Sequence, residues 1–247
     1  MRGQAFLRQR GVAVFVVLVL VLLTTLLVLW ASRSALLNEV VVGNDSDYQR
    51  ALEAAHALLR DAEMDIQGIR ADGTPCTADA TANCRTWGQF DTATRKSFYP
   101  ESESEVHDLQ AALGRSSPPC VAGICAPITT LSRDAASASV PTTEFWMDKA
   151  QLALMKTQAA RYGDYTGAKA GTVGNPLLVR SADKAWYWVE LLPYDMSAAL
   201  RSGAAARSFA PDATSPCVYR ITAVASGLKS GTQAVLQSTV VWRRTSS

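Results

Sequence analysis

The sequence has little histidine and lacks the short motifs that carry much of catalytic chemistry. Only two histidines occur among its 247 residues, His56 and His107, which is too few for a typical metalloenzyme and too far apart to pair by sequence. There is no glycine-rich phosphate-binding loop and no G-x-S-x-G nucleophile motif. We therefore expect a protein that is not an enzyme, with neither a metal site nor a cofactor, and we expect His56 to be a packing or surface residue.

Two short elements are similar to motifs of penicillin-recognising enzymes. Ser181 and Lys184 spell S-x-x-K, and the residues from Lys229 to Gly231 spell K-S-G. In those enzymes the first element opens a buried helix and a sizeable helical domain separates the two. Here both fall in predicted hairpin turns with about 45 residues, read as strands, between them. The pattern therefore does not favour this chemistry.

Charge is also scarce, and the positive excess is small. The formal net charge is +2, which is too little to indicate a nucleic-acid partner. Three of the 24 basic residues, Arg2, Arg8 and Arg10, lie in the first 11 residues, where there is no acidic residue, so 21 basic side chains face 22 acidic ones in the remainder. The basic excess belongs to the N-terminal segment.

The segment from Val12 to Trp30 contains no charged residue. Its only polar side chains are Thr24 and Thr25, which can bond back to helix carbonyls. As a helix it would be roughly 28 Å long, close to the roughly 30 Å hydrocarbon core of a bilayer and longer than a typical signal of about 7–15 apolar residues. Because positive charge precedes the run, we predict a single inner-membrane span in contact with lipid, a cytoplasmic N-terminus and a periplasmic C-terminal domain.

All five cysteines follow this run, and four of them form two close pairs. Cys76 with Cys84, and Cys120 with Cys125, each bracket a polar or glycine-containing loop, which favours two disulfide-closed loops in an oxidising compartment over a four-thiolate zinc site. The loops 74–87 and 116–127 are candidates for partner contacts or simple staples. Cys217 is expected to be a buried free thiol, although a bridge to one of the other four stays open.

Apolar residues at three- and four-residue steps predict a helix from Tyr48 to Ile66. Gly43 and Asn44 precede it and predict a kink or a weak turn between this helix and the apolar run, with Asp45 or Ser46 as a new cap. The predicted stripe consists of Tyr48, Ala51, Leu52, Ala55, Leu58, Leu59, Ala62 and Ile66.

Two shorter helices are predicted further on. In residues 100–114, Ser102 and Glu105 have capping-box spacing and Gly114 is a suitable stop. In residues 142–164, Thr142 or Thr143 is the expected cap. The expected inner face of this second helix is made of Phe145, Trp146, Ala150, Ala153 and Leu154.

The C-terminal third predicts an antiparallel sheet of about four strands, and hence an α+β fold. Residues 175–180 and 185–192 read as a hairpin, and residues 217–225 and 232–244 as a second one. Cys217, Tyr219, Ile221 and Ala223 share one face of a strand, as do Ala234, Leu236, Val240 and Trp242. For Trp186, Tyr187 and Trp188 we favour core packing over an exposed adhesive patch.

An anchor helix that continues into an exported amphipathic helix and packs on an antiparallel sheet resembles a type IV pilin. In that class, prepilin peptidase cuts after a glycine that follows a short basic leader. "RQRG" ending at Gly11 is similar to this site, and Val12 would become the new N-terminus. The resemblance implies a leader at 1–11, an anchor and amphipathic helix at 12–67, and an exported α+β domain at 68–247.

Three segments resemble PilX-type minor pilins more narrowly. They are "QRGVA" at 9–13, "ALEAAHALLRDAE" at 51–63, and "YRITAVASG" followed by "AVLQSTVVWRR" within 219–244. This resemblance implies a role in type IV pilus assembly, with prepilin peptidase, other minor and major pilins and a tip adhesin as candidate partners. A K-like minor pseudopilin of type II secretion, or a single-pass periplasmic binding protein that never enters a fibre, are the alternatives.

One departure from most pilins concerns the fifth residue after the cut. Most pilins have glutamate there, whereas this chain has Val16. A buried carboxylate is tolerable only when paired, so Val16 leaves a neighbour's N-terminal amine without a partner. By analogy with K-type pseudopilins we expect a place at or near the fibre tip. The membrane and fibre helix is represented by Val16, Leu20, Leu23 and Leu27.

Overall fold

The computed structural model describes residues 10–76, 83–85, 100, 102–128, 144–171, 174–193 and 217–241. The chain divides into two compact units, residues 1–46 and 47–247. The helix α1 (Arg10–Gln67) contributes to both, and the rest of the fold belongs to the second unit.

The helix α1 runs for 58 residues without interruption, so the predicted new helix cap at Asp45 or Ser46, after Gly43 and Asn44, is wrong. Neither residue has a positive φ, and both keep helical conformation. The physical reason is cooperativity, because one interior glycine costs only about 1 kcal/mol relative to alanine while helix continues on both sides.

The described part of the first unit is α1 from Arg10 to Ser46, and most of its apolar side chains are exposed. Thr24 and Thr25 donate their hydroxyls to the carbonyls of Val21 and Leu22, at 3.0 and 2.9 Å, as predicted. Within the described residues, α1 is the one helix long and apolar enough to cross a membrane, by length and composition.

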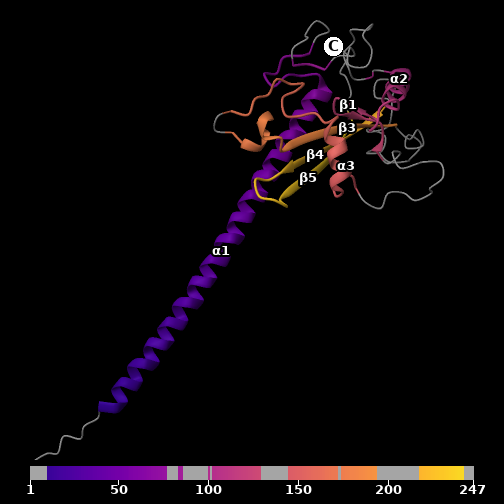
Figure 1. The fold of residues 1–247 in the computed structure, drawn as a ribbon. Helices are drawn as coiled ribbons and strands as arrows, with labels where there is room; N and C mark the ends of the chain where they lie inside the picture. Colours follow the sequence, from indigo (N-terminus) through magenta and orange to yellow (C-terminus); the bar gives the residue numbers. More distant parts are fainter. Residues whose placement is uncertain are drawn as a thin grey trace, which may run out of the picture. The chain divides into compact units, whose positions relative to one another are not determined.

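Within the described residues the sheet has five strands, in the order β1-β2-β3-β4-β5. Antiparallel pairing joins all neighbours except β2 and β3, which run parallel. The α+β class is therefore confirmed, but the sheet has one strand more than predicted (Figure 1). The strands are β1 (Cys120–Val121), β2 (Ile124–Cys125), β3 (Ala185–Pro193), β4 (Cys217–Ser226) and β5 (Gln233–Val240).

The predicted strand at 175–180 is wrong. Two 3-10 turns occupy this region, η3 (Pro176–Leu178) and η4 (Arg180–Ala182). The side chain of Asn175 caps the first turn by accepting from the backbone N–H of Leu177 and donates to the carbonyl of Arg50 on α1 at 2.6 Å. Asn followed by Pro is a turn signal, and here it overrides the apolar run that follows it.

The sheet separates two apolar layers. On one face α1 contributes Leu58 and Ile66 to a core with Tyr187 and Ile221. On the opposite face Trp186, Trp188, Phe145 and Met155 pack together, and Figure 1 shows α3 (Lys149–Lys156) on that side of the strands. The exposed fractions of Trp186, Tyr187 and Trp188 are 1, 0 and 0%, so core packing of these three aromatics is confirmed.

The helix α2 (Glu103–Leu113) has the predicted limits. The hydroxyl of Ser102 accepts from the backbone N–H of Glu105, and the helix ends at Gly114. His56 on α1 is exposed, which agrees with the expectation of a packing or surface residue. His107 on α2 is exposed as well.

The helix α3 differs from the prediction in its start and its face. Asp148 caps it by accepting from Ala150 and Gln151 at 2.8 and 2.9 Å, whereas Thr142 and Thr143 lie outside the described residues. The helix therefore begins after Phe145 and Trp146, and Met155 supplies its buried contact. The predicted inner-face residues Ala150, Ala153 and Leu154 are exposed.

Candidate functional site

From Val12 to Trp30, α1 presents a continuous apolar surface. The residues singled out from the sequence, Val16, Leu20, Leu23 and Leu27, are 48, 55, 51 and 62% exposed. Such a surface can bind only by apolar contact, to lipid chains or to other apolar helices.

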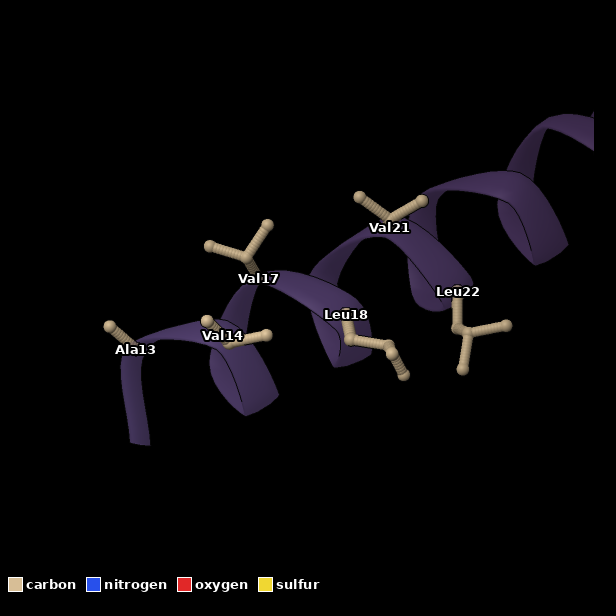
Figure 2. A pocket seen from close by; sticks show the side chains of 6 residues that line it. All are labelled: Ala13, Val14, Val17, Leu18, Val21 and Leu22. Atoms are coloured by element: carbon tan, nitrogen blue, oxygen red, sulfur yellow. The ribbon is translucent and has the colours of Figure 1, made fainter. Parts of the chain in front are cut away.

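A shallow hollow lies near the start of this surface. Figure 2 shows that its six lining side chains all project from one stretch of α1, so it is an open groove along a helix and not an enclosed cavity. The lining residues are Ala13, Val14, Val17, Leu18, Val21 and Leu22. The predicted processing residues adjoin it, since Gly11 is the second residue of α1 and Val12, 67% exposed, is the third.

The C-terminal half of α1 is attached to the sheet domain by three buried aspartates. Asp47, Asp61 and Asp65 are 2, 0 and 3% exposed. Ionised carboxylates are rarely buried without partners, and each of these three has several. Together they form what we name the aspartate attachment.

Asp47 is held by the turn between β4 and β5. The backbone N–H groups of Leu228 and Lys229 donate to its two oxygens at 2.9 and 3.0 Å, and Arg50 lies 3.4 Å away on the same helix. Burial acts to raise the pKa of this carboxyl, but the backbone donors, a hydrogen bond with the Thr232 side chain and the Arg50 charge together lower the pKa below its usual value. A Cβ at Gly227 would lie 2.2 Å from the Asp47 carboxylate, so the turn needs glycine here.

Asp65 forms a buried ion pair with Arg85. The guanidinium donates through Nε at 3.1 Å and through Nη2 at 2.7 Å, and the Tyr187 hydroxyl donates to the same carboxylate at 3.1 Å. Arg85 also donates to the carbonyl of Ala122 at 2.5 Å and lies 3.5 Å above the Tyr165 ring. Arg85 therefore connects α1 to both disulfide-closed loops, one ending at its neighbour Cys84 and one containing Ala122.

Asp61 lies one helical turn before Asp65. It accepts from the backbone N–H of Gly163 at 2.8 Å and from the Thr166 hydroxyl. Burial raises its pKa to about 6, and the charges of Asp65 and Asp164 act in the same direction. A raised pKa means that the folded chain holds this proton more tightly than the unfolded chain does.

We predict that Asp61 makes the protein more stable as the pH falls from 7 to 5. The folded pKa of about 6 lies above the usual 3.8, so the gain is about 1 kcal/mol over this interval. In Asp61→Asn, the amide oxygen can accept from Gly163 while the NH2 group donates to the hydroxyl oxygen of Thr166, and this part of the pH dependence should disappear. Urea unfolding of both proteins at several pH values measures it, and parallel stability curves would contradict the prediction.

Both predicted disulfides are present. Cys76 bonds to Cys84 and Cys120 to Cys125, while Cys217 is a buried free thiol whose pKa is raised by burial. The second loop is a buried hairpin: Cys120, Ile124 and Cys125 are 0% exposed. This favours the staple over the partner contact for that loop. The loop at 74–87 is described only in part.

The aspartate attachment was not predicted from the sequence, although the helical-wheel positions of the three aspartates indicated that they would be buried. At 100° per residue, Asp47, Asp61 and Asp65 fall on the same side of the helix as the apolar stripe through Leu58 and Ala62. A carboxylate on a face that must be buried implies a partner. The predicted stripe itself is largely confirmed, with Tyr48, 44% exposed, as its exception.

These features define a pilin-like chain, with one long helix that is apolar and exposed in its first half and packed on a mostly antiparallel sheet in its second. Comparison with protein families agrees. The family described as "PilX N-terminal" matches residues 10–59, and the "Type IV pilus assembly protein PilX C-term" matches residues 122–242. The chain therefore belongs to the PilX family of type IV pilus assembly proteins and is a minor pilin. No curated protein and no solved structure matches it.

The PilX family is one of type IV pilus assembly proteins. The S-x-x-K and K-S-G patterns noted in the sequence fall in turns that belong to the framework of the sheet domain. Ser181 lies in the turn η4, not in a hairpin turn as predicted, and the backbone N–H of Lys229 donates to Asp47.

Proposed function

We propose that this minor pilin is cleaved by prepilin peptidase after Gly11 and is N-methylated at Val12. It is then held in the inner membrane by residues 12–30, with its sheet domain in the periplasm, until it joins other minor and major pilins in the fibre. The observation that supports this most is the continuous apolar, exposed helix surface that starts immediately after Gly11. A surface of this kind suits lipid in the membrane and neighbouring helices in the fibre.

Mass analysis of the membrane-embedded protein tests the processing step. We expect Val12 as the first residue, with one added methyl group, and we expect the full leader in cells that lack prepilin peptidase. Gly11→Leu should keep the leader because a bulky side chain at this position hinders access of the protease. A leader retained in wild-type cells with active peptidase would contradict the proposal.

The position at the tip rests on Val16. In a fibre that packs one helix beside the next, a subunit without a carboxylate here cannot pair with the N-terminal amine of the subunit next to it. We predict that Val16→Glu spreads the protein along the shaft and changes the number of fibres per cell. Immunogold counting on sheared fibres measures both quantities, and Val16→Gln is the uncharged control. Unchanged tip placement would show that the missing carboxylate is not the determinant.

The same valine favours one alternative, a K-like minor pseudopilin of a type II secretion system. The two functions differ in the fibre that contains the chain. Recovery at low copy from sheared surface pili, together with loss of motility or adhesion on deletion, supports the pilus. A secretion defect without a pilus defect supports the pseudopilin, and absence from any fibre supports a single-pass binding protein.

A further inference from the structure

The strand β5 forms an edge of the sheet. Its eight residues pair with β4 one to one from Gln233 opposite Ser226 to Val240 opposite Tyr219, with no bulge in the register. Among the described residues the sheet ends at this strand, and Figure 1 shows it at the border of the strand layer. One row of backbone N–H and C=O groups along β5 thus points away from β4.

This edge lacks the usual protection against further pairing. Proteins blunt exposed edges with charged residues, proline, bulges or very short strands, and the sequence QAVLQSTV of β5 contains no charge, no proline and no glycine. The opposite edge is protected, because β1 has two residues and the Cys120–Cys125 disulfide closes the hairpin that contains it. Within the part of the chain that the structure describes, β5 is therefore the edge available for pairing.

The two faces of β5 determine what could pair with it. Ala234, Leu236 and Val240 face the α1 side and join the core there. On the other face Gln237 and Thr239 are exposed. A strand added to this edge continues both faces, so it needs apolar side chains at every second residue on the α1 side. On the other face it needs polar side chains beside Gln237 and Thr239, whereas Val235 there joins the second apolar cluster.

We propose that β5 receives an extended segment of another subunit of the fibre as an additional strand. The alternating row of donors and acceptors selects an extended backbone, since a helix satisfies its own backbone groups. The choice of a fibre subunit as the source of this segment rests on the proposed function. The unpaired edge of β5 among the described residues is observed independently of that function.

A symmetric second copy fits this edge less well. Two antiparallel β5 strands in one continuous sheet are related by a two-fold axis perpendicular to that sheet. This axis reverses the direction of residues 47–67 of α1, which pack on the sheet, in one copy relative to the other. Two chains anchored in the same membrane need these segments to run the same way, so the partner is a different subunit.

Photo-cross-linking in cells that assemble the fibre tests the proposal. A photoreactive amino acid is placed in the full chain at Gln237 or at Thr239, with Leu228 in the adjacent turn as the control position. We expect both strand positions to join one peptide of another fibre subunit, at sites two residues apart, as paired strands require. We expect the Leu228 probe not to reproduce this spacing.

A second variant links the contact to pairing at the edge. Thr239→Lys places a charge on the edge strand and should abolish the cross-link from position 237 while the melting temperature stays unchanged. Gln151→Lys, on the exposed side of α3, should leave the cross-link intact. Links to this chain's own residues, links to a second copy, or no link at all would overturn the proposal. If the chain starts at Val12 and enters fibres but gives no link, only this inference fails.

Discussion

Replacement of Arg85 by methionine is expected to lower the free energy of unfolding by about 3–5 kcal/mol. The guanidinium and the Asp65 carboxylate are both almost fully buried, with side chains 2 and 1% exposed. Removal of the positive partner leaves a charge on α1 for which, among the described residues, the Tyr187 hydroxyl is the remaining side-chain donor, and it also removes the link to Ala122. Urea denaturation of the detergent-solubilised full chain, followed by tryptophan fluorescence, measures the change.

Two controls separate this effect from general disruption. Arg180→Ala breaks the ion pair with Asp164, in which the arginine side chain is 74% exposed, and should cost about 0–1 kcal/mol. The double variant Arg85→Met, Asp65→Leu removes both charges and should recover part of the lost stability. If the single variant were as stable as the wild type, the ion pair would not hold α1 to the disulfide-closed loops.

Gly123→Ala is expected to destabilise the protein by about 2–4 kcal/mol, because two separate penalties coincide. The φ of Gly123 is +84°, which disfavours any side chain, and an added Cβ would lie 2.5 Å from the Cβ of Ala160. Gly123 itself cannot move freely, because both of its backbone groups are hydrogen-bonded. The Gly123 N–H donates to Gln158 at 2.5 Å, and its carbonyl accepts from Val189 of β3 at 2.7 Å.

Gly231 provides a matched control for Gly123. Its φ is +89°, but a Cβ there meets no atom within 4 Å. Gly231→Ala should therefore show only the backbone penalty of about 1–2 kcal/mol. Thermal unfolding of the two variants side by side measures the difference, and equal losses would mean that the contact with Ala160 is relieved by a local shift.

Local sequence patterns correctly predict those helices and strands in which the same face is buried along the whole element. The stripe from Ala51 to Ile66 and the alternation from Cys217 to Ala223 are such patterns, and the structure has a helix and a strand at these positions. The cap of α2 was also predictable, since Ser102 and Glu105 are neighbours in sequence. At Gly43 the local rule failed because the helix on either side outweighs one unfavourable residue.

The rest depends on contacts between distant parts of the chain. Asp61 bonds to Thr166 across 105 residues, and Leu228 bonds to Asp47 across 181 residues. A helical wheel could identify these carboxylates as buried, but not their partners. The inner face of α3 shows the same limit, because the tertiary contact of Met155 decides which side is buried, and its apolar residues alone do not.

In the proposed fibre, the aspartate attachment has a mechanical consequence. Its three carboxylates are separated by up to 18 residue steps along α1, roughly 27 Å of helix, and each bonds to a different segment of the sheet domain. A pull along this part of the helix would strain all three sites at once, in shear, rather than peel them away one after another. The load that separates helix from sheet is therefore shared among Asp47, Asp61 and Asp65.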